Sequence, residues 1–99
     1  MNAEMPPPMS GPELAAAVDD LEGWGLLDGK LHKEFVFDGF AEAFGFMASA
    51  ALLAERANHH PEWSNIYNKV WVELVTHDAG GITRFDIELA MAFDRLVAS

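Results

Sequence analysis

Hydrophobic residues recur along this chain with two periods. Three segments repeat them at spacings of three and four residues, which is typical of amphipathic helices. Other segments alternate apolar and more polar residues, which is typical of strands with one buried face. The pattern predicts helices over residues 11–22, 39–57 and 83–98, and strands over 24–27, 30–37 and within 62–77, where a turn near 65–68 divides the segment into two strands.

Capping residues mark the predicted helix starts. Ser10 and Glu13 have capping-box spacing ahead of the first helix, and Thr83 and Asp86 have it ahead of the last. Asp38 can cap the middle helix. The expected buried stripes are Leu14, Val18 and Leu21 in the first helix, Phe40, Phe44, Met47, Ala51 and Ala54 in the second, and Phe85, Leu89, Phe93 and Leu96 in the third.

Turn residues and alternation define two hairpins. Asp28-Gly29 is typical of a type I′ turn, which needs positive φ at both central residues. In the last strand, Val70, Val72 and Leu74 fall on one face, and Trp71, Glu73, Val75 and His77 fall on the other.

The order of elements predicts an α+β fold, α-ββ-α-ββ-α, with a four-stranded antiparallel sheet and helices packed on one face. The other face is then open to water or to a second subunit, and Trp71 and Val75 on it favour a partner. We expect one domain over residues 10–99, preceded by a flexible proline-rich leader over residues 1–9.

Composition narrows the functional classes. The formal net charge of −10, from 16 acidic and 6 basic residues, disfavours binding to nucleic acid or to an anionic membrane. Cysteine is absent, which excludes thiolate chemistry and disulfides. The start of the chain lacks the features of a signal peptide, and no apolar run reaches the ~18 residues of a membrane helix. We expect a soluble, cytoplasmic protein.

The candidate chemistry lies at the predicted end of the middle helix. Pro61 disfavours helical backbone at His60, so the helix should end near Asn58 and place His59 and His60 at a corner. Imidazole is the natural acid or base near neutral pH. Glu55, four residues before His59, is spaced to reach that imidazole. The structural alternative is that one histidine caps the helix and the other is exposed.

The other two histidines differ in their predicted settings. His77 ends a strand just before a loop, where sites are commonly built, whereas His32 lies mid-strand and should face solvent. A zinc site of His59, His60 and His77 is an alternative. However, tandem histidines are awkward as two ligands and no HExxH spacing exists, so no metal is expected. Asp86, at a helix start, either only caps the helix or orients a histidine.

An ordered set of residues resembles a known family. Its anchors are Glu55, His59-His60-Pro61, Tyr67, His77 and Asp86, and its blocks are Gly23-Trp24, FGFM at 44–47, HHPEW at 59–63, YNKV at 67–70, TH at 76–77 and DIELA at 86–90. Together they resemble the pterin-4a-carbinolamine dehydratases, also known as the dimerisation cofactor of a homeodomain transcription factor. The resemblance covers roughly residues 14–95 and excludes the proline-rich leader.

The resemblance implies an activity. Family members dehydrate 4a-hydroxytetrahydropterin to quinonoid dihydropterin, which recycles the cofactor of aromatic amino acid hydroxylases. General acid/base catalysis suffices, without a metal or redox cofactor. By position, His59, His60 and His77 resemble the active-site histidines, with His60 and His77 expected to transfer protons.

The same resemblance suggests supporting residues and partners. Asp86 and Glu55 are expected to orient the pocket, and Trp24 and Trp63 either lie near the flat pterin ring or pack in the core. The family implies homodimers or homotetramers. It also supplies an alternative function, that of a non-catalytic adaptor, transcriptional coactivator or assembly factor on the same fold.

Overall fold

The computed structural model describes residues 5–98 and has the predicted order of elements, which confirms the α+β fold class. A short 3₁₀ helix, η1, is the only element within these residues that the sequence pattern did not predict. The elements are α1 (Gly11–Asp19), β1 (Gly25–Leu27), β2 (Lys30–Val36), α2 (Phe40–Ala57), β3 (Glu62–Ile66), β4 (Lys69–Leu74), η1 (His77–Ala79) and α3 (Arg84–Val97).

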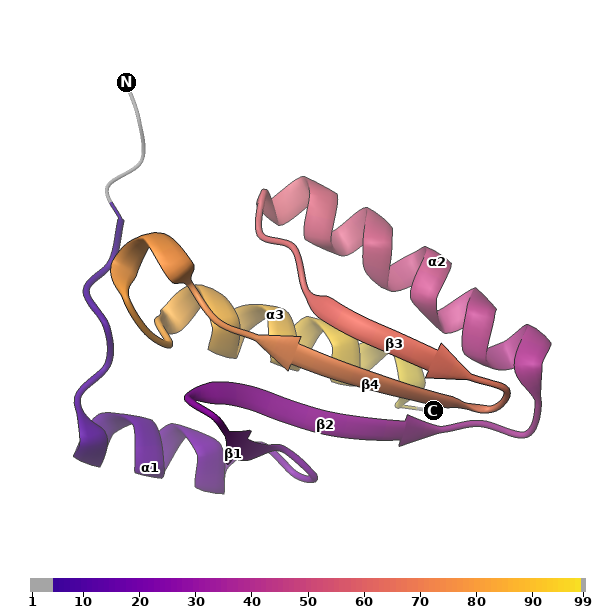
Figure 1. Cartoon of the computed structure of the whole chain (residues 1–99), viewed down its shortest axis with the longest axis horizontal. Helices are drawn as coiled ribbons and strands as arrows, with labels where there is room; N and C mark the ends of the chain where they lie inside the picture. The colour runs from indigo at the N-terminus through magenta and orange to yellow at the C-terminus, as the bar shows by residue number, and fades with distance from the viewer. Residues whose placement is uncertain (1–4, 99) are drawn as a thin grey trace.

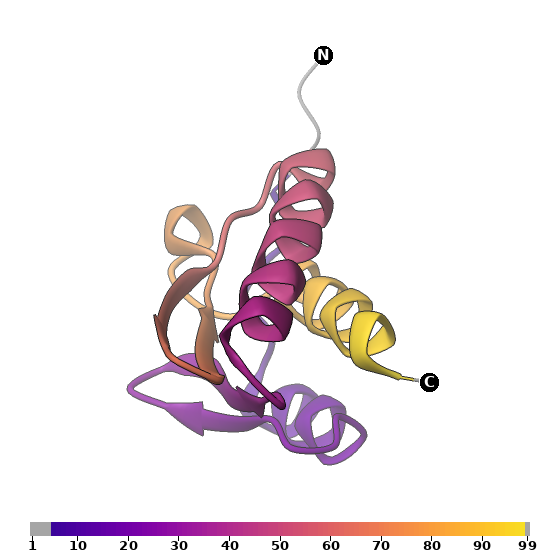
Figure 2. The same cartoon turned by 90° about the vertical axis from the view of Figure 1, so that its right-hand side faces the viewer.

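The four strands form one antiparallel sheet in the order β1-β2-β4-β3. The long helices α2 and α3 cover one face of this sheet, as Figures 1 and 2 show. The central β2–β4 pairing places Leu31 opposite Leu74 and Phe35 opposite Val70. All four of these side chains are buried, so the central strands supply the core under the helices.

Both hairpin turns lie where the sequence predicted them. Asp28 and Gly29 have φ values of 53° and 79°, which confirms the type I′ turn. The second hairpin turns at Tyr67, whose φ is 53°, and at Asn68. The Asn68 side-chain amide donates to the Phe37 carbonyl oxygen at 2.9 Å, so it ties this turn to the chain beyond β2.

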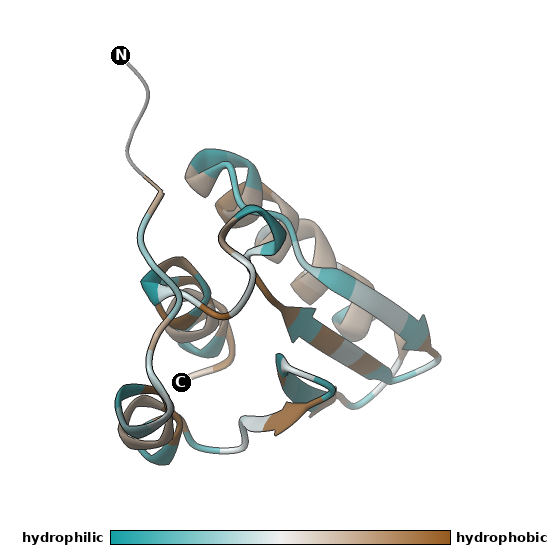
Figure 3. Cartoon of the chain, turned by 60° about the vertical axis from the view of Figure 1, so that its left-hand side comes forward, coloured by the Kyte–Doolittle hydropathy of each residue, from teal (hydrophilic) through white to brown (hydrophobic). Residues whose placement is uncertain are grey.

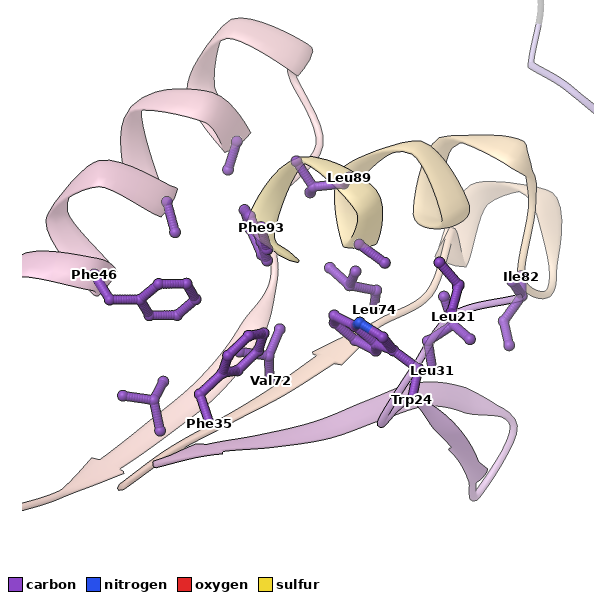
Figure 4. Close-up of a cluster of buried hydrophobic side chains, with 14 of the residues drawn as sticks. Leu21, Trp24, Leu31, Phe35, Phe46, Val72, Leu74, Ile82, Leu89 and Phe93 are labelled. Atoms are coloured by element: carbon purple, nitrogen blue, oxygen red, sulfur yellow. The ribbon is translucent and has the colours of Figure 1, made fainter. Parts of the chain in front are cut away.

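The core fills the space between the sheet and the two long helices (Figure 4). Val70, Val72 and Leu74 are fully buried, as their alternation predicted. Phe46 of α2 lies between the sheet and α3, with its ring centroid 4.6 Å from that of Phe35 and 6.1 Å from that of Phe93. Aromatic contacts therefore join α2, β2 and α3.

The predicted buried stripe of α2 was largely wrong. Phe40 and Phe44 are 51% and 58% exposed, and Ala51 is exposed as well. The buried residues are Ala43, Phe46, Ala50 and Ala54. Both stripes have helical spacing, and the observed one is richer in alanine, whose small side chain lets α2 approach β4 and α3 closely.

The ends of two helices also differ from the prediction. Gly39, without a side-chain cap, precedes α2 in place of Asp38. The first helix ends at Asp19 and not at residue 22, although Leu21 beyond it is still buried. In α3, Leu96 of the predicted stripe is 40% exposed.

The capping boxes of Ser10 with Glu13 and of Thr83 with Asp86 are both formed as predicted.

Part of the predicted leader contacts the folded chain. Pro6 is buried, and the Met9 backbone N–H donates to the Ile82 carbonyl oxygen at 2.9 Å. These contacts attach residues 6 and 9 to the folded chain. The flexibility expected of residues 1–9 stays a prediction, and residues 1–4 lie outside the described residues. Between residues 5 and 98, no helix combines the length and apolarity needed to cross a membrane.

Candidate active site

Three predicted site histidines border one open cleft of about 600 Å³, where the end of α2 meets η1. Figure 3 shows hydrophilic residues at this end of α2 and in the neighbouring η1 loop. His59 and His60 come from the segment after α2, and His77 begins η1. Thr76 and Phe85 also line the cleft, so the site combines residues from distant parts of the chain.

A left-handed residue separates the tandem histidines from the helix. Asn58 ends α2 with φ 52° and ψ 42°, and asparagine tolerates this conformation better than most residues. The His59 backbone N–H donates to the Ala54 carbonyl oxygen at 3.1 Å, which closes the turn. The side chain of His59 is only 12% exposed, whereas that of His60 is 59% exposed. The corner therefore directs one imidazole inward and leaves the other accessible.

Asp86 is the buried centre of a hydrogen-bond network at the inner wall of the cleft. Its Oδ1 lies 2.5 Å from Nε2 of His59. Its Oδ2 accepts from the Thr76 hydroxyl and from the Thr83 backbone N–H, each at 2.8 Å, and the two threonine hydroxyls lie 2.9 Å apart. The fully buried carboxylate thus caps α3 with one oxygen and orients His59 with the other.

The two accessible histidines each contact a different carboxylate. Nε2 of His60 lies 2.9 Å from Glu55 Oε1, and Nε2 of His77 lies 2.8 Å from Glu62 Oε2. The expectation that Glu55 reaches His59 was therefore wrong. The left-handed turn at Asn58 interrupts the helical repeat, so the spacing of four residues no longer places those side chains together.

All three imidazoles present the same ring nitrogen, Nε2, to a carboxylate. A carboxylate that is ionised can only accept a hydrogen bond, and the Nε2 atom that faces it then carries the hydrogen. The second nitrogen, Nδ1, is then the basic atom of the neutral ring. Within residues 5–98, no group of three or more His, Cys, Asp or Glu side chains is arranged to hold a metal ion.

The structure places neither predicted tryptophan among the residues that line the cleft. Trp24 is buried in the core (Figure 4). Its Nε1 donates to both carboxylate oxygens of Asp94 at 3.0 Å. Trp63 of β3 pairs with Val72 and packs against the core cluster. Core packing, one of the two uses expected from the sequence, is what the structure shows for both residues.

Sequence reasoning gave neither Thr76 nor Glu62 a role in the site, although both lie within the blocks that carry the family resemblance. A signal for Thr76 existed, because the alternation that buries Val70, Val72 and Leu74 continues to it and places a polar side chain on the core face. No comparable signal marked Glu62, whose contact with His77 depends on how β3 and η1 meet in space. His32 lies mid-strand as predicted, with its side chain 28% exposed.

Comparisons with known proteins agree with this arrangement. A family model described as pterin 4 alpha carbinolamine dehydratase matches residues 7–96. A relative from Solibacter usitatus is 50% identical over 90 residues, 91% of this chain and 95% of its own length. One from Bradyrhizobium sp. (strain ORS 278) is 52% identical over 93 residues, 92% of this chain and 93% of its own. The names of both assign them to the pterin-4-alpha-carbinolamine dehydratases.

A solved structure shares the fold as well. A crystal structure from Brucella melitensis, described as a transcriptional coactivator/pterin dehydratase, superposes with a TM-score of 0.88 at 42% sequence identity. The match covers 92% of this chain and 99% of that one. This chain therefore belongs to the pterin-4a-carbinolamine dehydratase family, and the resemblance seen in the sequence is confirmed.

Proposed function

We propose that this chain is a 4a-hydroxytetrahydrobiopterin dehydratase. It converts pterin-4a-carbinolamine to quinonoid dihydropterin and water, and so recycles the pterin cofactor of aromatic amino acid hydroxylases. The observation that carries the proposal is the placement of His59, His60 and His77 around one open cleft in a member of this family.

The chemistry of the reaction suits these side chains. Loss of water requires that a ring nitrogen of the substrate gives up a proton and that the leaving hydroxyl group receives one. No electron or hydride is transferred, so general acid/base groups with a pKa near neutrality suffice, and the ordinary pKa of imidazole is about 6.5.

The site suggests a division of roles among its histidines. His60 and His77 are accessible to a ligand in the cleft and transfer the two protons. His59, held by buried Asp86, forms the fixed inner wall of the cleft. Glu55 orients His60.

A stopped-flow assay tests the activity. A hydroxylase generates the carbinolamine, this protein is added, and the absorbance of quinonoid dihydropterin is followed. We expect a rate well above the spontaneous reaction and proportional to protein concentration. A rate equal to the spontaneous reaction, from folded protein, would remove the dehydratase proposal and favour the non-catalytic adaptor.

We also propose that the protein is a homodimer or homotetramer. Leu52 and Phe44 of α2 are 73% and 58% exposed, and Trp71 lies on the sheet face away from the helices. Burial of such apolar surface favours association. Light scattering should give more than one protomer per particle, and Phe44→Ser should reduce that number. A wild-type monomer would contradict the proposal.

We also propose that the protein is located in the cytoplasm.

A further inference from the structure

Glu62 joins a site histidine to a lysine on another strand. It is the first residue of β3, and its two carboxylate oxygens have different partners. Oε2 lies 2.8 Å from Nε2 of His77, and Oε1 lies 2.6 Å from the ammonium nitrogen of Lys30. The carboxylate is therefore held from two sides, and its orientation relative to His77 is defined.

The sheet sets the position of this carboxylate. Glu62 pairs with Glu73 of β4, and β4 in turn pairs with β2, whose first residue is Lys30. Lys30 extends to the carboxylate of Glu62 and keeps a longer distance of 4.0 Å from that of Glu73. The hydrogen bond from Lys30, and then that from His77, lower the pKa of Glu62, so the carboxylate is ionised at neutral pH.

An ionised carboxylate determines which nitrogen of His77 carries the hydrogen. Because the carboxylate only accepts, the Nε2 atom facing it must donate. Nδ1 of the neutral ring is then unprotonated and available as a base, and Nδ1–H of the charged ring is available as an acid.

We infer that Glu62 is a positioning residue for the proposed dehydration, because it fixes the Nε2–H form of His77 and assigns proton exchange with the substrate to Nδ1. This inference rests on the proposed function. Lys30 helps to hold Glu62 in this role, because its ammonium group donates a hydrogen bond to the second carboxylate oxygen of Glu62. Both side chains of the His77–Glu62 pair are partly exposed to solvent, so we expect a modest effect on turnover.

The substitution Glu62→Gln provides a sharp test. Lys30 can only donate, so it retains the amide oxygen and turns the amide NH₂ group toward His77. Nε2 of His77 must then accept, and the ring changes to its Nδ1–H form. The tautomer is read from the ¹⁵N chemical shifts of the His77 ring, which do not depend on activity.

We expect wild-type His77 in the Nε2–H form and the Glu62→Gln variant in the Nδ1–H form. The variant's kcat should fall about two- to fivefold while KM changes little. Glu73→Gln is the matched control, since Glu73 lies beside the same lysine and opposite Glu62 in the sheet. It should leave both the tautomer and kcat unchanged.

Two results would overturn the inference. An unchanged His77 tautomer in Glu62→Gln would show that the carboxylate does not set the form of the ring. A changed tautomer with wild-type kcat would show that the contact has no part in proton transfer. Wild-type protein without turnover would instead overturn the proposed function, and the ¹⁵N shifts would still decide whether Glu62 sets the tautomer.

Discussion

Asp86 shows at the scale of one residue how a structural and a functional role can share a side chain. The sequence offered helix capping and histidine orientation as alternatives, and the carboxylate does both with different oxygens. Its position in α3 was predictable, because a capping box depends on local spacing. Its contact with His59, 27 residues away along the chain, was not, because that contact depends on how α2 and α3 pack.

Replacing Asp86 by asparagine should destabilise the protein. The amide keeps the shape of the carboxylate but offers one neutral acceptor oxygen in place of two ionised ones, so the hydrogen bonds to His59, Thr76 and Thr83 are lost or weakened. We expect the free energy of unfolding to fall by about 2 kcal/mol in urea denaturation. Glu88→Gln, on the exposed side of the same helix, should change it by less than about 0.5 kcal/mol. Equal effects would contradict the network described for Asp86.

The pair of Lys30 and Glu62 should make stability depend on pH. The folded-state pKa of Glu62 is lowered below its ordinary value of 4.5, first by the hydrogen bond from Lys30. The ionised Glu62 carboxylate therefore contributes fully to the stability of the fold above pH 4.5, its ordinary pKa. That contribution is lost as the pH falls through the lowered pKa of the folded state. Lys30→Met should reduce the loss of stability between neutral pH and a pH of about 3, measured by urea denaturation. An identical pH profile in wild type and variant would refute this.

At the scale of elements, the sequence predicted turns and helix caps reliably, but it predicted less reliably which face of a helix is buried. Both hairpin turns and both capping boxes follow from a few neighbouring residues, and the sequence predicted them. The buried face of α2 was misassigned because this helix has two apolar stripes with the same period. Only the neighbouring β4 and α3 select between those stripes, and they select the one with more alanine.

Phe46→Ala tests the observed face of α2. Phe46 contacts aromatic rings of β2 and α3, so its loss leaves a cavity in the core. We expect the free energy of unfolding to fall by about 3–5 kcal/mol relative to wild type at the same protein concentration. Phe44→Ala, two residues away and exposed, should cost less than about 1 kcal/mol in dilute protein. A larger loss of unfolding free energy from Phe44→Ala than from Phe46→Ala would show that the buried face of α2 is the one predicted from the sequence.

The whole molecule carries a net charge of −10 within dimensions of 38 × 31 × 24 Å. The Debye length is about 30 Å at 0.01 M salt, so at that ionic strength most of these charges repel one another across the molecule. It is about 8 Å at 0.15 M salt. The urea midpoint at neutral pH should therefore rise over this range of sodium chloride. A constant or falling midpoint would show that local ion pairs outweigh the net repulsion.

The site itself forms only at the scale of the whole chain. Its histidines follow α2 or begin η1, and their carboxylates come from α2, β3 and α3. Family resemblance pointed to the three histidines, and the structure places them around one cleft. Neither spacing nor resemblance indicated that each imidazole would present Nε2 to a separate carboxylate.

The most direct test of the account compares stopped-flow dehydration rates of wild type, His60→Ala and His77→Ala, with folding checked by circular dichroism. The account predicts that each variant loses about 10²-fold or more of the catalysed rate while staying folded, because each removes a group that transfers a proton. His32→Ala, a histidine outside the cleft, should retain the wild-type rate. Wild-type rates in both His60→Ala and His77→Ala would contradict the assignment of catalysis to this cleft.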